Sequence, residues 1–371
     1  MTMGKESRPT HVVVNATEVG RGRGGNETYI AGLIEGLSAL SSRPEASLLT
    51  CEWKAAPTFP PDFRQLNLGP YHPLPFLLWQ QTVALRRLEA DWYLSNYYLP
   101  LLLPCKGAVV VHDLSFRAHP EYYPRAMACY MRLLTAWAVR LADRVLTVSA
   151  FSQQELVRFY PAAKGKVHIV PNGVRSEFQP RPDGAAILAD LEAISSYGVA
   201  PPYILAVGNI HPRKNLSRLL DAYIHLRQNR SSTPEMVWVG APRWGSAELL
   251  DRARSVGVLL TGFVAQEDLP ALYRRAEMLV YPSLYEGFGL PPVEAMACGT
   301  PVITSNTTSL PEVVGRAALT VDPTDVRAIA GAMARLLDDP VLTKELTEAG
   351  IERAQRYTWP RAARELLAAL Q

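Results

Sequence analysis

Cysteine is scarce in this chain, and its four copies form no recognisable metal-binding or redox pattern. They are Cys51, Cys105, Cys129 and Cys298, far apart, with no C-x-x-C pair and no Cys/His spacing of the kind that binds zinc. We therefore expect a protein of a reduced compartment, without a disulfide framework and without a structural metal.

Long apolar runs and an excess of one charge are also missing. The longest apolar run, residues 99–111, is too short to span a bilayer and is interrupted by Pro100, Pro104 and Lys106. The first ten residues are polar and lack the apolar core of a signal peptide. The net charge of +3 gives no support for a nucleic-acid partner. These absences predict a cytoplasmic protein without a transmembrane anchor; peripheral contact at the cytoplasmic face of a membrane stays open.

What is present is a regular alternation of apolar, strand-like runs with helical segments, over 371 residues that suit two domains. Such alternation is typical of parallel sheets in a doubly wound α/β fold. We expect a first domain over residues 1–180 and a second over residues 190–357. The helices expected beside the motifs span about residues 28–40, 124–141 and 152–160, the last with Ser152 as its N-cap. The expected strands are residues 11–15, 48–52, 92–95, 108–111, 144–148, 167–170, 203–207, 235–239, 258–260, 278–281, 301–304 and 318–321.

The most informative segment covers residues 285–299. It reads Tyr-Glu-Gly-Phe-Gly-Leu-Pro-Pro-Val-Glu-Ala-Met-Ala-Cys-Gly and places Glu286 and Glu294 eight positions apart. The proline pair suits the first turn of a helix and Gly299 suits its C′ position, so Glu286 is expected on a loop and Glu294 in the early helix. Glycine amides and a helix N-terminus favour phosphate, and carboxylates accept hydrogen bonds from sugar hydroxyls. The segment therefore predicts a nucleotide-sugar site.

A pair of cations follows the first strand of the second domain. Gly208 and Asn209 form a short loop ahead of Arg213 and Lys214, and a helix is expected to begin near Leu216. Two adjacent cations at this place can neutralise the charge that develops on a leaving nucleoside diphosphate.

Two strand ends in the first domain carry further candidates. His112 terminates an apolar strand at the carboxyl edge, where open α/β sheets place their ligands. A glycine cluster stands between the first strand and the first helix, and Gly20, Gly22 and Gly25 formally fit G-x-G-x-x-G. Spacing alone therefore does not exclude NAD, although the acidic residue expected after the next strand is missing and Glu52 is only a distant candidate.

Taken together, these motifs resemble the retaining glycosyltransferases of the family 4 type, also called glycosyl transferases group 1. G-F-G-L-P-P stands between the two glutamates, A-x-A-C-G-T-P-V-I follows, and an H-D-L segment begins at His112, so the resemblance covers most of the chain. It implies the α/β GT-B architecture, in which two Rossmann-like doubly wound domains face each other across a cleft. The last helix, about residues 358–371, would pack back on the first domain. The chain departs from the pattern at Asn209, where many relatives carry arginine.

The resemblance also implies roles for the candidate residues. Arg213 and Lys214 would clamp the diphosphate, Glu286 would hold sugar hydroxyls, and Glu294 would hold the ribose. His112 would face the transferred sugar. The other donor-binding positions are expected to be Gly208, Asn209, Gly262, Phe263, Val264, Gly287, Phe288, Gly289 and Leu290.

In the first domain, the resemblance assigns Asp113 to orienting His112 or bracing its loop. The loop for the acceptor and the donor phosphate is expected to use Gly24, Gly25 and Asn26, with Arg21 and Arg23 able to meet an anionic acceptor.

No D-x-D occurs in the sequence, so the usual carboxylate pair for a catalytic divalent metal is missing. We expect metal-independent, retaining transfer of a hexose-type sugar from a UDP- or GDP-sugar to a glycan or lipid-linked acceptor, without a further cofactor. Polysaccharide biosynthesis is the expected setting. A glycoside hydrolase, which also uses two carboxylates, stays open as an alternative, as do an NAD-linked dehydrogenase and a catalytically silent nucleotide-sugar-binding subunit.

Aromatic residues gather between residues 70 and 100, together with Arg86 and Arg87. This stretch could stack on acceptor sugars or rest on lipid headgroups. Ordinary packing in the core and at its rim is the interpretation we prefer at this point.

Overall fold

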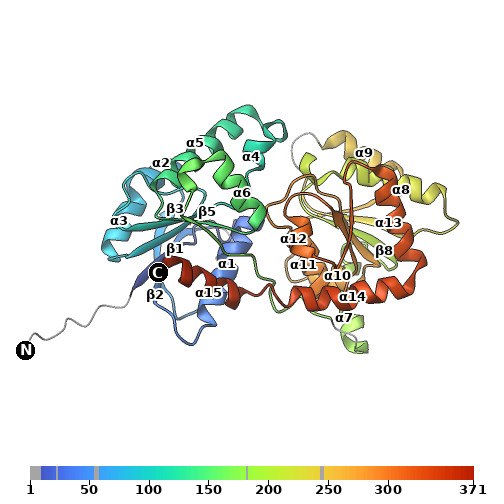
Figure 1. The fold of residues 1–371 in the computed structure, drawn as a ribbon. Coiled ribbons are helices and arrows are strands. Elements are labelled where there is room, and N and C mark those ends of the chain that lie inside the picture. Colours follow the sequence, from blue (N-terminus) through green and yellow to red (C-terminus); the bar gives the residue numbers. More distant parts are fainter. Residues whose placement is uncertain (1–9, 22–23, 54–57, 181–182, 243–245) are drawn as a thin grey trace, which may run out of the picture. The chain divides into compact units, whose positions relative to one another are not determined.

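The computed structural model describes residues 10–21, 24–53, 58–180, 183–242 and 246–371, so Arg23, a predicted acceptor contact, lies outside the described residues. The chain divides into two compact units (Figure 1). The first unit ends at Gly173 rather than at residue 180, and it takes up Thr358–Gln371. The second unit spans Val174–Tyr357.

The first unit is built on a seven-stranded sheet in the order β3-β2-β1-β4-β5-β6-β7, and its pairings are parallel. Val13 of β1 belongs to the core cluster covered by α3 and α5, while its neighbours Val12 and Val14 are buried as well, so both faces of the sheet are covered. The strands are β1 (His11–Asn15), β2 (Glu45–Glu52), β3 (Arg64–Pro70), β4 (Trp92–Asn96), β5 (Lys106–Val110), β6 (Arg144–Thr147) and β7 (Val167–Ile169). The helical segments are α1 (Gly25–Ser38), α2 (Pro73–Pro75), η1 (Phe76–Gln80), α3 (Gln81–Arg87), α4 (Ser115–Ala118), η2 (Pro120–Tyr122), α5 (Arg125–Leu141), α6 (Ala150–Phe159), η3 (Pro161–Ala163) and α15 (Trp359–Leu370).

The second unit has a six-stranded parallel sheet in the order β10-β9-β8-β11-β12-β13. Its strands are β8 (Tyr203–Val207), β9 (Glu235–Val239), β10 (Leu259–Gly262), β11 (Met278–Tyr281), β12 (Val302–Ser305) and β13 (Leu319–Val321). Its helical segments are α7 (Gly184–Ser195), η4 (Pro212–Lys214), α8 (Leu216–Gln228), α9 (Ala247–Ser255), α10 (Leu269–Arg275), α11 (Leu290–Ala297), α12 (Leu310–Val314), α13 (Val326–Asp338) and α14 (Pro340–Ala354).

Each sheet has a topological switch point. In the first unit the chain winds outward from β1 through β2 to β3, then crosses to β4 on the other side of β1. In the second unit it winds from β8 through β9 to β10, then crosses to β11 on the other side of β8. Open α/β sheets bind ligands outside the carboxyl ends of the strands where the winding reverses. Ligand sites are therefore expected at the carboxyl ends of β1 and β4, and at those of β8 and β11.

The last helix, α15, is held in the first unit by Trp359. Its buried indole lies against Gly32 and Gly36 of α1, where an added Cβ would come within 2.0 Å of the ring and 2.2 Å of the Trp359 carbonyl oxygen. Gly173 is equally tight, at 2.4 Å from the Trp359 backbone nitrogen. Glycine is needed at all three positions because Trp359 packs so closely against them that no side chain would fit.

Three local expectations need correction. Helix α1 begins at Gly25, three residues before the expected start at residue 28. Strand β3 was not expected, because only Leu66 and Leu68 are apolar in this half-exposed edge strand. The N-cap of α6 is Ser149 and not Ser152: the Ser149 hydroxyl accepts a hydrogen bond from the Ser152 amide at 3.1 Å, which is the N3 contact of a capping side chain. Among the described residues, no helix is both long and apolar enough to cross a membrane.

Candidate active site

Most of the predicted site residues lie at the switch point of the second unit, where hydrogen bonds connect the loops that follow β8 and β11. The Leu284 amide donates to the Arg213 carbonyl oxygen at 2.7 Å, and the Ser283 hydroxyl donates to the same oxygen at 3.0 Å. Asn215, in the left-handed conformation at φ 58°, donates through Nδ2 to the Pro282 carbonyl oxygen at 3.0 Å. These bonds fix the cation pair of one loop beside the first glutamate of the other.

Glu286 is the centre of a buried ionic cluster. Its Oε2 accepts a hydrogen bond from Arg213 Nη1 at 2.7 Å, and its Oε1 accepts one from Lys214 Nζ at 2.6 Å. Two hydroxyls, from Ser283 at 2.6 Å and Tyr281 at 2.9 Å, also donate to Oε1. The predicted clamp residues and the predicted sugar-binding carboxylate are thus one hydrogen-bonded unit.

The charge state of Glu286 follows from these contacts. Burial alone would raise the pKa of the carboxyl, but Arg213 and then Lys214 outweigh it and lower the pKa to about 2. Glu286 is therefore ionised at neutral pH and a poor proton acceptor in a general-base step. It remains a strong acceptor of hydrogen bonds.

The floor of the site is made of backbone at the ends of three neighbouring strands. Gly208 follows β8, Gly240 follows β9 and Gly262 ends β10; the Gly240 amide donates to the Gly262 carbonyl oxygen at 2.8 Å. A Cβ on Gly240 would meet the Gly208 carbonyl oxygen at 2.1 Å, and one on Gly208 would meet Lys214 Cε at 3.4 Å. Because glycine has no Cβ, the Lys214 side chain can lie directly against the backbone of Gly208.

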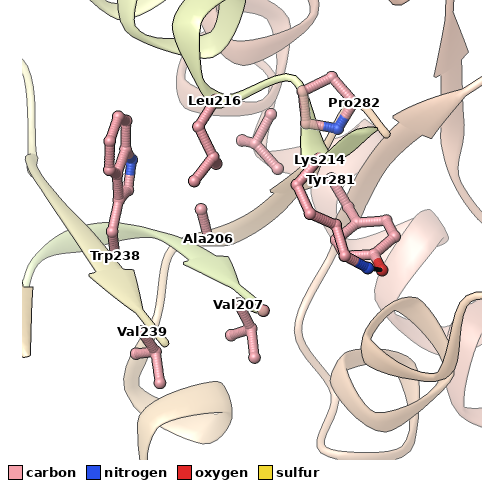
Figure 2. A pocket seen from close by; sticks show the side chains of 10 residues that line it. Ala206, Val207, Lys214, Leu216, Trp238, Val239, Tyr281 and Pro282 are labelled. Carbon is pink, nitrogen blue, oxygen red and sulfur yellow. Dashed lines mark hydrogen bonds between the residues drawn. The ribbon is translucent and has the colours of Figure 1, made fainter. Parts of the chain in front are cut away.

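Figure 2 shows Lys214 with its Nζ at the Tyr281 hydroxyl, to which it also donates. Beside them is a cavity of about 10 Å³, lined in part by Val207, Trp238 and Val280. A cavity of this size holds about one water molecule, so it is not itself a sugar pocket.

The loop before α11 is held by the segment that precedes α12. The Ser309 hydroxyl donates to the carbonyl oxygens of Glu286 at 2.9 Å and Phe288 at 3.1 Å, and the Glu286 amide donates to Thr308 Oγ1 at 3.3 Å. Gly289 is the N-cap at φ 95°, a left-handed conformation that suits glycine. Helix α11 then starts at Leu290 and ends with Gly299 in the C′ position at φ 81°, as the sequence predicts.

Glu294 lies on α11 and makes a separate contact. Its Oε2 accepts a hydrogen bond from the Tyr273 hydroxyl of α10 at 2.9 Å. Burial raises the pKa of Glu294 to about 7, against the opposing effects of the Tyr273 hydrogen bond and of Arg175. The second oxygen, Oε1, accepts no hydrogen bond from any described residue, so it can receive one from a ligand.

The other predicted donor positions are neighbours of these loops. Gly262 has the left-handed φ of 72°, and Phe263 after it is 67% exposed, while Val264 is buried. Asn209 is half-buried next to Gly208, Gly287 is buried after Glu286, and the buried Phe288 ring packs edge-on against Tyr357. All of them belong to the second unit.

In the first unit, His112 follows β5 and is oriented by Asn96, which ends β4. His112 Nε2 and Asn96 Oδ1 are 3.0 Å apart, and Asn96 Nδ2 donates to the Asn26 carbonyl oxygen at 3.3 Å. Burial lowers the pKa of His112 to about 4, although Asp113 opposes the change. The imidazole is neutral at pH 7, with Tyr29 packed edge-on against it at a ring-centroid distance of 4.7 Å.

Asp113 braces its own loop. Its Oδ1 accepts hydrogen bonds from the Ser115 amide at 2.9 Å and hydroxyl at 2.6 Å, which settles the choice between the two roles considered for it. Gly24 is the N-cap of α1 at φ 94°, and Gly25 opens the helix with nothing near its Cβ position. The Arg21 guanidinium lies over the Trp53 and Tyr71 rings, at 4.7 and 5.0 Å from the centroids.

Sequence reasoning missed the uncharged residues that hold the charged ones. The missed residues are Asn96, Tyr273, Tyr281, Ser283, Thr308 and Ser309. Tyr281 and Ser283 stand at the carboxyl end of β11, a position that could have signalled them; nothing in the pattern around Thr308 or Ser309 points to the loop they support.

Comparison with known proteins agrees with this geometry. Residues 193–355 match the family model described as glycosyl transferases group 1, and residues 23–178 match the model described as glycosyltransferase family 4. The chain is 36% identical over 269 residues to the O-antigen chain mannosyltransferase B of Escherichia coli, covering 71% of this chain and 69% of that protein. The chain belongs to the family 4 glycosyltransferases.

Solved structures identify the fold of this glycosyltransferase. Sucrose-phosphate synthase from Thermosynechococcus elongatus superposes with a TM-score of 0.76 at 23% identity, over 97% of this chain and all of that one. HepE from Anabaena, in complex with UDP and glucose, gives 0.74 at 17% identity, over 97% and 99% of the two chains. The predicted GT-B fold is confirmed. The family assignment also makes the protein an enzyme of glycosyl transfer and sets aside the hydrolase, dehydrogenase and silent-subunit alternatives.

Proposed function

We propose that this glycosyltransferase moves a hexose, with mannose as the first candidate, from a nucleoside diphosphate sugar to a glycan or lipid-linked acceptor in polysaccharide assembly. The transfer proceeds with retention at the anomeric carbon, and it uses neither a metal ion nor a further cofactor. The observation that carries the proposal is the cluster of Arg213, Lys214 and Glu286 at the switch point of the second sheet. The choice of sugar is supported by the relative named as a mannosyltransferase, and a nucleoside diphosphate donor by the UDP complex of HepE.

The two cations supply the charge that the departing group requires. As the bond from the anomeric carbon to the phosphate oxygen breaks, negative charge grows on the diphosphate, and Arg213 with Lys214 stabilises it. The N-terminus of α11 adds its amides and the positive end of its dipole. The acceptor oxygen forms the new bond on the same face, and its proton goes to the phosphate oxygen that leaves.

Glu286 acts in this scheme as an exchangeable counter-ion. A diphosphate that draws Arg213 and Lys214 toward itself weakens their bonds to the Glu286 carboxylate. Because its pKa is about 2, the carboxylate stays ionised and can accept hydrogen bonds from sugar hydroxyls instead. Glu294 Oε1 would accept from the ribose, and neutral His112 would bond a hydroxyl of the transferred sugar.

The direct test is a panel of UDP- and GDP-hexoses scored by released nucleotide, with and without glycan and lipid-linked acceptors. Lys214→Ala should lower kcat by about 100- to 1000-fold, the usual loss for one preorganised charge-stabilising donor. Lys344→Ala is the matched control, because Lys344 lies in the same unit with a side chain 77% exposed. Full activity of Lys214→Ala, with the control unchanged, would remove the lysine from the clamp.

A further inference from the structure

Helix α5 of the first unit exposes several large apolar side chains, although Met131 and Leu141 pack against the core cluster. Its buried residues are small or polar: Ala128, Thr135, Ala138 and Val139. Tyr130, Leu133 and Trp137, spaced at three and four residues, form one stripe on the outside. A surface helix normally turns such a stripe toward the core.

The helical run from α2 through η1 to α3 also exposes large apolar side chains. Phe76, Ala84 and Leu85 are buried, whereas Leu78 and Trp79 are exposed. The loop after β4 adds a further apolar side chain to the same run. Leu102 is exposed, and its carbonyl oxygen accepts a hydrogen bond from the Thr82 hydroxyl at 2.6 Å.

These exposed residues lie on one side of the unit. Helices α3 and α5 insert side chains into the same core cluster, so they cover the same face of the sheet, and Figure 1 draws α2 and α5 along the same margin of the first unit. Partial burial raises the pKa of Tyr130 of α5, and the nearby Tyr71, just ahead of α2, raises it further. We name this surface the apolar-basic face; its apolar members, between 42 and 66% exposed, are Leu78, Trp79, Leu102, Tyr130, Leu133 and Trp137.

The segment that carries the apolar-basic face has an excess of positive charge. Residues 63–143 contain eight Lys and Arg residues against five Asp and Glu residues, whereas the rest of the chain holds 30 of each. Four exposed arginines stand at the helix ends: Arg86 and Arg87 close α3, and Arg125 and Arg140 lie in the first and last turns of α5.

We propose that the apolar-basic face docks on the headgroup region of a bilayer that contains anionic phospholipid. Aromatic and aliphatic side chains would enter the boundary between headgroups and acyl chains, and the arginines would meet lipid phosphates. A second copy of the chain fits less well, because two faces that each carry an excess of arginine would repel one another. Docking is independent of the proposed donor chemistry and would hold the enzyme where lipid-linked acceptors are found.

The test is co-sedimentation of the full chain with vesicles of phosphatidylcholine alone or mixed with phosphatidylglycerol. We expect binding to the anionic vesicles that weakens as salt is added. Trp79→Ala with Trp137→Ala should reduce partitioning by at least about tenfold, since two interfacial anchors are lost. Arg86→Gln with Arg87→Gln should reduce it by about tenfold or more on anionic vesicles only.

Matched controls come from exposed residues of the same kind away from the apolar-basic face. Leu188→Ala with Val341→Ala removes side chains that are 69 and 66% exposed in the second unit. Lys344→Gln with Arg364→Gln removes two exposed charges. Both pairs should bind vesicles like the unaltered protein.

Several results would overturn the proposal: no sedimentation with anionic vesicles, equal loss in controls and variants, or a concentration-dependent dimer that Trp79→Ala with Trp137→Ala abolishes. Release of nucleotide with a water-soluble acceptor should be unchanged in both variants of the face. That measurement separates a failure of docking from a failure of the proposed transfer.

Discussion

Replacing Glu286 by glutamine keeps the shape of the side chain and removes the negative charge between two cations. The partners are well enclosed, with Arg213 21% and Lys214 12% exposed at the side chain. The pKa of the carboxyl is 4.5 in its ordinary environment and about 2 here. At about 1.4 kcal/mol per pKa unit, the ionised carboxylate stabilises the folded state by roughly 3 kcal/mol at neutral pH.

An independent estimate agrees with this figure, because removing one partner of a buried ion pair costs about 3–5 kcal/mol. For a domain of this size, such a loss lowers the thermal midpoint by roughly 10 °C. The stabilisation is present above pH 4.5 and is lost as the pH falls toward about 2, so variant and unaltered protein should converge in acid.

The assay is thermal unfolding of Glu286→Gln with and without UDP or GDP. A diphosphate brings the missing negative charge to Arg213 and Lys214, so it should raise the midpoint of the variant more than that of the unaltered protein. Turnover should nevertheless fall by about 100-fold, because a sugar hydroxyl loses its charged acceptor. Glu345→Gln, an exposed change in the same unit, is the control. Equal midpoints, or an equal response to nucleotide, would refute the reasoning.

Two further predictions concern affinity and packing. The raised pKa of Glu294, about 7, makes the fold less stable as the pH rises from 4.5 to 7. A ribose that prefers the carboxylate should bind more weakly by up to about tenfold for each pH unit below 7, because the carboxylate becomes protonated. Calorimetry of UDP and GDP at several pH values should show this component in the unaltered protein and not in Glu294→Gln; identical profiles would contradict a role at the ribose. Gly32→Ala should cost about 1–3 kcal/mol in urea unfolding, because its Cβ would meet the Trp359 ring at 2.0 Å. Gly331→Ala, also in a helix but with open space at its Cβ position, should be stabilising by up to about 1 kcal/mol, and similar effects of the two changes would argue against the packing of Trp359.

Much of the architecture was accessible from the sequence alone. Buried parallel strands such as Tyr203–Val207 are short apolar runs bounded by proline or glycine, and the proline pair and Gly299 mark the two ends of α11. These signals are local, since they depend on the preferences of neighbouring residues. Strand β3 was not predicted for the same reason: this edge strand contains only two leucines, which are too few to form a recognisable local pattern.

The tertiary structure alone decided which charges meet and which apolar residues stay outside. Glu286 is 72 residues from Lys214, and only the parallel order of β8 and β11 brings their loops together, with a pKa near 2 as the result. The aromatic stretch that sequence patterns favour as ordinary packing divides in the structure: Phe76 and Tyr93 enter the core, while Trp79 faces outward. Periodicity reports that a helix has an apolar stripe, but the direction of that stripe depends on where the sheet lies, and the sheet is assembled from segments far apart in the chain.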